Sequence, residues 1–165
     1  MDMYGELILE HSKRPVASGL RDGHAGEAYH VNTTCGDEVT VRVHLSQTAG
    51  ADSVLAPGDV TLTDLSYDAT GCSISMAATS MLAQEAIGES VADSLDVYRG
   101  VQAMLTSRGQ DAGDVEEIGD AVALAGVSKY PARVKCALLG WSAYLDALAR
   151  AGVDISSVKS SIKTP

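Results

Sequence analysis

The sequence predicts an α+β domain in which helices pack on one face of a small three-stranded antiparallel sheet. After one short helix, apolar residues recur at every second position up to about residue 70 and at helical spacing beyond it, so strands precede helices. The segments between the predicted strands are too short for a helical crossover, which makes the sheet antiparallel. The length of 165 residues fits one domain. We expect a single domain over residues 1–152 and a flexible C-terminal tail over residues 153–165.

The sheet is expected early in the chain. A short amphipathic helix comes first, over residues 4–11, and Pro15 prevents its continuation. Three strands follow, at about residues 28–31, 39–45 and 60–67. The middle strand has the clearest pattern, because Val39, Val41 and Val43 alternate with polar residues, as in a half-buried strand.

Helices are expected after residue 71. The first covers residues 74–88 and ends at Gly88. The second begins at Ser90, with Asp93 three residues later in the manner of a capping box, and extends to residue 105. A short helix fits within residues 118–127. Pro131 suits the first turn of a last helix, which ends at Gly152.

Composition and charge exclude several classes of function. The chain has 45% hydrophobic and 21% charged residues, which is typical of a folded domain rather than a disordered one. Its 22 acidic and 12 basic residues give a net charge of −10, with no basic stripe, so nucleic acids and anionic membranes are poor partners. No apolar run approaches the length of a membrane span, and charges occupy the place of a signal peptide's apolar core, so we expect a cytoplasmic location.

The three cysteines are the residues most suited to chemistry. An odd number cannot pair fully within the chain, and no two of them are close enough in sequence to form a zinc-ribbon or thioredoxin motif. Motifs of serine hydrolases, zinc proteases, phosphate-binding loops and dinucleotide-binding folds are absent from the sequence. The cysteines therefore serve packing, metal binding or catalysis.

Each cysteine has an informative local setting. Cys35 lies at the turn between two predicted strands, where Asp37 can point to the same side, so the two residues form half of a tetrahedral metal site. Cys72 lies at the junction of sheet and helix, where the helix dipole favours the thiolate. Cys136 lies one turn into the last helix on the same face as Arg133, whose natural carboxylate partner is Asp37. The alternative is that each cysteine is a small buried apolar residue, and this alternative is strongest for Cys136.

A second group of possible ligands lies in a polar loop. Asp22, His24 and Glu27 have the composition of a ligand cluster, but a surface loop rich in glycine explains them better. The acidic stretch from residue 109 to residue 129 is likewise explained as a solvated face.

Three motifs around the cysteines resemble those of the IscU/NifU-like family of iron-sulfur scaffolds. They are NTTCGD at residues 32–37, GCSIS at 71–75 and RVKCALL at 133–139. His11, Pro15 and Gly19 also fit the family's amino-terminal stretch, so the resemblance covers about residues 4–148.

Among the branches of this family, SufU proteins show the closest resemblance. IscU-type scaffolds have a histidine immediately before the third cysteine, whereas this chain has Lys135 there. The acidic stretch at 109–129 looks like the insertion that marks SufU proteins. The family's usual proline in the first motif is replaced by Thr33, which removes no ligand atom.

The resemblance implies a zinc-dependent sulfurtransferase. SufU proteins bind one zinc through three cysteines and an aspartate, which correspond here to Cys35, Asp37, Cys72 and Cys136. They accept sulfur from a SufS-type, pyridoxal-phosphate-dependent cysteine desulfurase and pass it to downstream Suf components for iron-sulfur cluster assembly. In this scheme a histidine of the desulfurase replaces Cys35 at the zinc, the freed Cys35 attacks the persulfide, and Arg133 holds Asp37.

Two alternatives remain open at this point. The same four residues would hold an iron-sulfur cluster if the protein were a cluster assembly scaffold, although Lys135 in place of histidine weakens that case. A closed structural zinc in a non-catalytic adaptor is the other alternative, and the turn around Cys35 argues mildly against it.

Overall fold

The computed structural model describes residues 3–50 and 53–159, which form one layered α+β domain. The elements follow in the order α1 (Met3–Lys13), β1 (Gly26–Asn32), β2 (Asp37–Leu45), the 3-10 helix η1 (Pro57–Asp59), β3 (Leu62–Thr70), α2 (Ser73–Ala86), α3 (Val91–Leu105), α4 (Val115–Ile118), the 3-10 helix η2 (Gly119–Lys129), α5 (Pro131–Arg150) and α6 (Ser156–Lys159). None of the helices in this part of the chain is long and apolar enough to cross a membrane.

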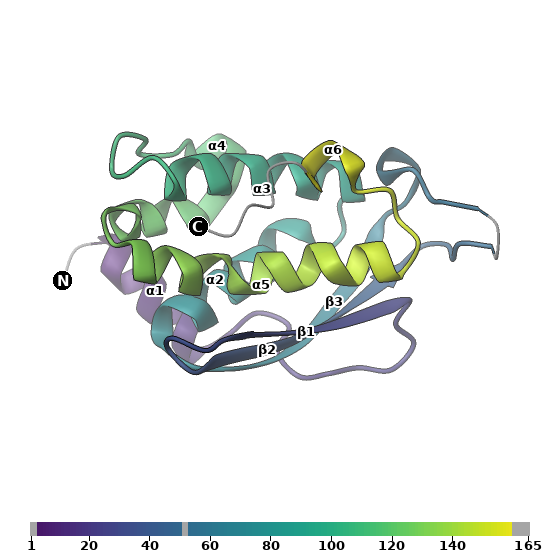
Figure 1. The fold of residues 1–165 in the computed structure, drawn as a ribbon, viewed down its shortest axis with the longest axis horizontal. Helices are drawn as coiled ribbons and strands as arrows, with labels where there is room; N and C mark the ends of the chain where they lie inside the picture. Colours follow the sequence, from purple (N-terminus) through teal and green to yellow (C-terminus); the bar gives the residue numbers. More distant parts are fainter. Residues whose placement is uncertain (1–2, 51–52, 160–165) are drawn as a thin grey trace.

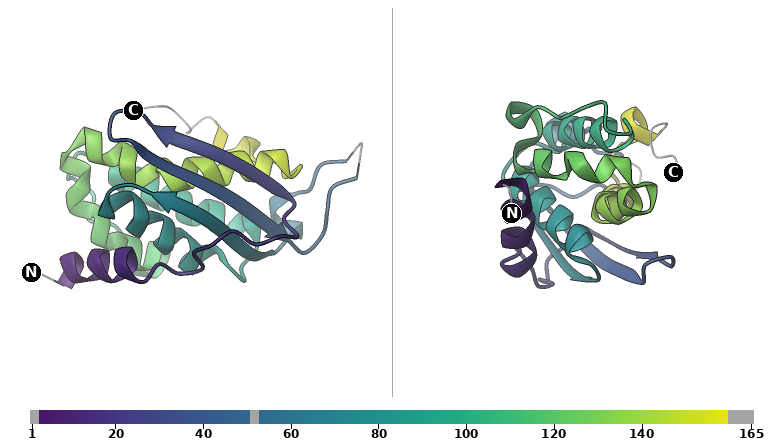
Figure 2. Two further views of the ribbon diagram at one scale, coloured as in Figure 1. Left: turned by 90° about the horizontal axis from the view of Figure 1, so that it is seen from below. Right: turned by 90° about the vertical axis from the view of Figure 1, so that its left-hand side faces the viewer.

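The sheet has the order β1-β2-β3, and both strand pairs are antiparallel. Helix α5 packs along β1 and β2, α2 packs between α5 and β3, and α3 with η2 forms a further layer above them (Figure 1). Figure 2 shows that these helices lie on one face of the sheet. The predicted fold class is therefore confirmed.

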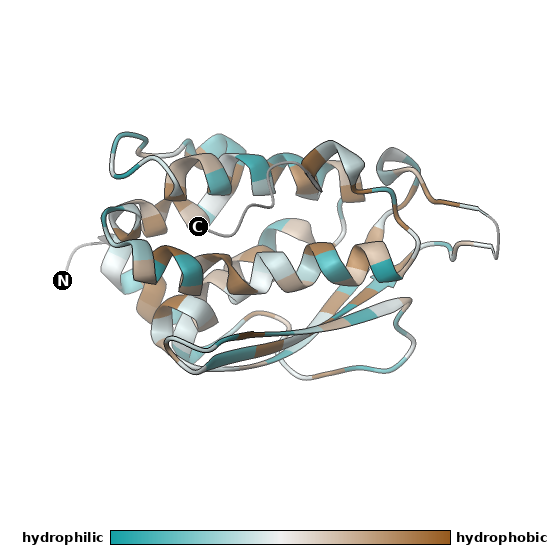
Figure 3. Ribbon diagram, in the orientation of Figure 1, coloured by the Kyte–Doolittle hydropathy of each residue, from teal (hydrophilic) through white to brown (hydrophobic). Residues whose placement is uncertain are grey.

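The core lies between the sheet and the helices. The three valines that alternate along β2, from Val39 to Val43, point into it and are buried, whereas most residues between them are only partly covered. A further part of the core lies between α5 and α3, where Trp141 packs against Tyr98 and the Tyr144 hydroxyl pairs with Ser94 Oγ at 2.6 Å. Figure 3 shows hydrophobic and hydrophilic residues interspersed along the helices and strands, as expected for elements with one buried and one exposed side.

Local sequence signals place several helix ends correctly. Ser90 Oγ accepts a hydrogen bond from the Asp93 backbone N–H at 3.1 Å, which is the predicted cap of α3. Pro131 occupies the first turn of α5, as expected. The short helix predicted within residues 118–127 is instead the end of α4 followed by η2, whose tighter 3-10 turns extend to Lys129.

The C-terminal segment differs from the expected flexible tail. Val153, Ile155 and Val158 are buried, and the Asp154 N–H donates to the Leu55 carbonyl at 2.8 Å. Residues 153–159 thus join the core, because every second or third of them is apolar and buried, and Ser157 Oγ of α6 accepts a hydrogen bond from Arg99 of α3 at 3.1 Å. Residues 160–165 of the expected tail lie outside the described part of the chain.

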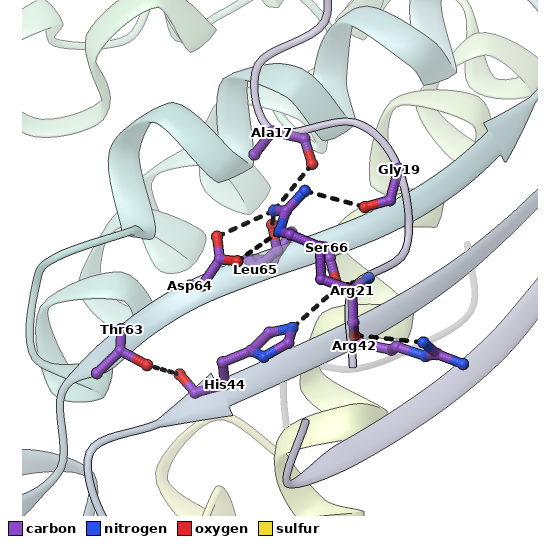
Figure 4. A network of polar contacts seen from close by, with 9 residues as sticks. All are labelled: Ala17, Gly19, Arg21, Arg42, His44, Thr63, Asp64, Leu65 and Ser66. Atoms are coloured by element: carbon purple, nitrogen blue, oxygen red, sulfur yellow. Dashed lines mark hydrogen bonds and ion pairs between the residues drawn. The ribbon is translucent and has the colours of Figure 1, made fainter. Parts of the chain in front are cut away.

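A strap, residues 14–25, joins α1 to β1 across the face of the sheet that the helices leave open (Figure 2). Arg21 fixes it (Figure 4): Nε and Nη2 donate to the two Asp64 carboxylate oxygens at 2.6 and 3.0 Å, and the guanidinium also donates to backbone carbonyls of the strap and of Leu65. This bidentate pair lowers the pKa of Asp64. Under the strap His44 is buried, which lowers its pKa, and it pairs with Ser66 Oγ.

A second buried polar network joins α1 to α2 and η2. His11 Nδ1 lies 2.7 Å from Ser80 Oγ, and His11 Nε2 lies 2.9 Å from a carboxylate oxygen of Asp120. Ser80 Oγ also accepts from the Val16 backbone N–H at 2.8 Å. Although the three side chains match a hydrolase triad in type, Ser80 is completely buried, so the network holds helices together.

Candidate metal centre

Three segments that are distant in sequence meet at the end of the sheet where α5 begins (Figure 1). The turn between β1 and β2 supplies Cys35, the first residue of β2 is Asp37, the residue before α2 is Cys72, and the second turn of α5 supplies Cys136. Asn32 pairs with Asp37 and closes the hairpin, so the turn that carries Cys35 lies at the edge of the core.

Asp37 is the anchored member of this group. Asp37 is only 1% exposed. Its Oδ1 accepts a hydrogen bond from the Cys72 backbone N–H at 2.9 Å. Gly71 makes this approach possible, because a Cβ there would lie 2.1 Å from Asp37 Oδ1. The sequence between β3 and α2 thus holds the carboxylate in place through its backbone.

The thiols of Cys35 and Cys136 are in contact. Their Sγ atoms lie 3.4 Å apart, with Cys136 completely buried and Cys35 exposed. The Asn32 side-chain amide donates to Cys136 Sγ at 3.6 Å. From the sequence, Asn32 was only a part of the first motif and had no predicted role. The signal that could have indicated its contact with Cys136 is its pairing with Asp37, which closes the hairpin.

These residues offer one compact set of ligand atoms. Cys35, Asp37 and Cys136 each place one ligand atom within 4.8 Å of the others, and this is the one such group among the residues that the structure describes. Cys72 lies beside it, with Sγ 3.6 Å from Asp37 Oδ2. In the polar loop, Asp22 and Glu27 instead pair with Arg42, and these loop residues form no ligand group in that part of the chain.

The donor set fits a zinc ion. Ligand atoms around a tetrahedral zinc are separated by about 3.5 to 3.8 Å when bond lengths are about 2.0 to 2.3 Å. The two closest contacts here, Cys35 with Cys136 at 3.4 Å and Cys72 with Asp37 at 3.6 Å, have nearly this spacing. Thiolates favour soft metals in general, so the same set also suits iron in a cluster.

Burial makes a metal useful at this site. It raises the pKa of the Cys136 thiol, and hydrogen bonds with Asp37 and Cys35 raise that pKa further. Without a cation, the thiolate of Cys136 is therefore the minor form at neutral pH. A divalent metal supplies the positive charge that a cluster of thiolates and a buried carboxylate requires.

The predicted cation for Asp37 lies at the surface. Arg133, in the first turn of α5, is exposed, and within the described residues its guanidinium forms no ion pair with Asp37 or any other carboxylate. Lys135 is exposed as well. The pairing of Arg133 with Asp37 therefore stays a prediction.

The fold and the site together define a small α+β domain with a cysteine-rich group that could hold a metal at one end of its sheet. The chain belongs to the family described as NifU-like N terminal domain, which matches residues 3–137. It is 33% identical over 149 residues to an iron-sulfur cluster assembly scaffold protein IscU of Streptococcus pyogenes, covering 90% of this chain and 84% of that protein. It is also 33% identical over 141 residues to the zinc-dependent sulfurtransferase SufU of Bacillus subtilis, covering 86% of each.

A solved structure supports the same relationship. The crystal structure of a protein described as a putative iron-sulfur cluster assembly scaffold for the SUF system, from Fervidobacterium islandicum, superposes with a TM-score of 0.69 at 27% identity. That comparison covers 87% of this chain and 94% of the other. The predicted family is therefore confirmed.

Proposed function

We propose that this protein is a zinc-dependent sulfurtransferase that accepts persulfide sulfur from a SufS-type cysteine desulfurase in the cytoplasm. The observation that carries the proposal is the contrast within the ligand group: Cys35 is exposed on a turn, while Asp37 and Cys136 beside it are buried. An exposed thiol on a turn can leave the group and meet a partner, whereas the buried ligands stay in the core. Similarity to the Bacillus subtilis protein supports zinc as the metal.

The bound zinc supplies the positive charge that keeps its cysteine ligands deprotonated at neutral pH. When the desulfurase docks, Cys35 turns outward as a thiolate and attacks the terminal sulfur of the partner's persulfide. The new bond joins Cys35 Sγ to that sulfur, and the bond to the desulfurase cysteine breaks, leaving a thiolate there. The sulfur then passes from Cys35 to downstream Suf components for cluster assembly.

Asp37 and Arg133 accompany this step. Asp37 keeps its hydrogen bond from the Cys72 N–H while Cys35 moves. Arg133 lies at the start of α5 with its guanidinium exposed, one helical turn before Cys136, and it pairs with Asp37 when the ligand set changes.

Cluster assembly on the same residues is the second candidate function. The observation that favours it is that several relatives, including the Streptococcus pyogenes protein, are named scaffold proteins. Lys135 before Cys136 weighs against it, because this position carries the histidine in IscU-type proteins.

Metal analysis with a desulfurase assay tests the proposal. We expect one zinc per purified chain and a large stimulation of a SufS-type desulfurase, which Cys35→Ala abolishes and the exposed Thr33→Ala preserves. Normal stimulation by Cys35→Ala contradicts sulfur transfer through this residue. Iron with labile sulfide in place of zinc, together with weak stimulation, favours the scaffold.

The role of Arg133 is tested separately. Arg133→Ala should keep most of its zinc and transfer sulfur poorly, because the charge that compensates Asp37 is lost. Arg150→Ala, at the other exposed end of α5, is the control. A transfer rate unchanged in Arg133→Ala shows that the pairing with Asp37 is irrelevant.

A further inference from the structure

The contact between Cys35 and Cys136 joins two thiols of very different accessibility. Their sulfur atoms are 3.4 Å apart, close to van der Waals contact. Cys35 is exposed and Cys136 is completely buried. A sulfur-donating reagent from solvent therefore reaches Cys35 first, and a sulfur electrophile formed there lies against a second thiol.

The third cysteine lies beside Asp37. Cys72 Sγ contacts Asp37 Oδ2 at 3.6 Å and Ser75 Oγ at 4.0 Å, and it is not part of the group formed by Cys35, Asp37 and Cys136. The Cys72 backbone N–H donates to Asp37 Oδ1 at 2.9 Å, which keeps Cys72 next to this carboxylate. Of the two other cysteines, Cys136 is thus the one aligned with Cys35.

We propose that Cys136 is a resolving thiol, which attacks a persulfide on Cys35 and releases its outer sulfur as sulfide. A Cys35 Sγ–Cys136 Sγ bond forms, and the bond between Cys35 Sγ and the outer sulfur breaks. The outer sulfur leaves as hydrosulfide and carries off the proton of the Cys136 thiol, so the products are one disulfide and one H₂S. The sulfane sulfur is reduced and the two cysteines are oxidised, so no further reagent is needed.

The reaction is confined to the metal-free chain. A zinc ion bound by Cys136 would withdraw electron density from its sulfur and hold that sulfur in the ligand set, which would make Cys136 a poorer nucleophile, so the loaded protein would retain a persulfide on Cys35. Loss of the metal makes Cys136 available, and the stored sulfur is then lost as sulfide after one turnover. This inference rests on the proposed function for the biological source of the persulfide, but the chemistry depends only on the two thiols.

The test uses the full-length, metal-free, reduced protein and glutathione persulfide as the donor. After brief exposure and desalting, sulfide release and intact mass are followed with time. We expect one sulfide per labelled chain, a mass two hydrogens below that of the reduced chain, and a peptide cross-link between Cys35 and Cys136. Cys136→Ser should keep the added sulfur and release sulfide at least tenfold more slowly, whereas Thr33→Ala, at an exposed position of the turn that carries Cys35, should behave as the unmodified protein.

Several results overturn the inference. They are equally fast sulfide release from Cys136→Ser, a cross-link from Cys35 to Cys72, or absence of labelling at Cys35. Cys136→Ala replaces the serine variant if buried serine prevents folding, which the urea unfolding midpoint reveals. Zinc added before the donor should slow the loss of sulfur at least tenfold, and unchanged loss also refutes the inference.

The two proposals fail in different ways. If a SufS-type desulfurase passes no sulfur to Cys35, the proposed function fails while the result with glutathione persulfide stands. If transfer from the desulfurase is normal but Cys136→Ser still releases sulfide, the resolving role alone fails.

Discussion

Addition of one methyl group at Gly71 is the most direct test of how the candidate metal site is packed. A Cβ at this residue would lie 2.1 Å from Asp37 Oδ1 and 2.7 Å from Asp37 Cγ. The backbone φ of Gly71 is +153°, a conformation that other residues rarely adopt. Gly71→Ala therefore forces the carboxylate and the β3–α2 junction apart.

The expected cost follows from the contacts that are lost. Displacement of Asp37 removes its hydrogen bond from Cys72 N–H, and a hydrogen bond to a charged group contributes about 1.5–3 kcal/mol. Backbone strain at a position suited to glycine adds about 1–3 kcal/mol. We expect the metal-free variant to lose about 3–5 kcal/mol of unfolding free energy and its zinc affinity to fall by about tenfold or more.

Urea unfolding of the metal-free chain and competition with a zinc chelator measure both effects. Gly23→Ala is the matched control, because Gly23 also has positive φ, +85°, but a Cβ there meets nothing within 4 Å. It should lose only about 1–2 kcal/mol and keep its zinc affinity. Equal midpoints and equal affinities for the two variants would refute the idea that Gly71 exists to admit Asp37.

Three further substitutions test the rest of the fold by urea unfolding. Asp64→Asn breaks the pair with Arg21 and should cost about 1–2 kcal/mol at pH 7. Since the pKa of Asp64 is lowered in the folded state, this difference should begin to shrink as the pH falls below about 4 and should vanish only below the lowered folded-state pKa, and a constant difference contradicts it. Ser80→Ala leaves His11 and a buried backbone N–H without their partner, so we expect a loss of about 2–3 kcal/mol, whereas a loss below 0.5 kcal/mol contradicts a structural role for this network. Val158→Ala should cost about 1.5–2.5 kcal/mol, and an unchanged midpoint would restore the view that this segment is a loose tail.

Features set by neighbouring residues could be predicted from the sequence. The alternation along β2 and the Ser90 cap of α3 each depend on residues within a few positions, and both are confirmed. Cys35 and Asp37 were recognised as a pair for the same reason, since a tight turn brings positions two apart to one side. The family motifs then linked them to Cys136, and the structure places these three together.

Features that depend on distant contacts could not be predicted. Burial of Val153 and Val158 requires contacts with parts of the chain that are distant in sequence, which no local pattern reveals. The helical spacing that put Arg133 on the face of Cys136 fixed its direction around the helix, but not whether its long side chain turns to Asp37 or to solvent. The hydrogen bond from Cys72 to Asp37 depends on how β3 ends against β2, which sequence spacing does not specify.

The order in which the ligand segments occur along the chain has a consequence for biosynthesis. Asp37, Cys72 and Cys136 come from the early, middle and late parts of the sequence, and Cys136 reaches the others only when α5 has packed along the sheet. A chain emerging from the ribosome therefore has no complete site until nearly the whole domain has been made and folded. With the proposed ligand set, acquisition of a metal would thus be a late event in the life of each molecule, and one that would distinguish finished chains from unfinished ones.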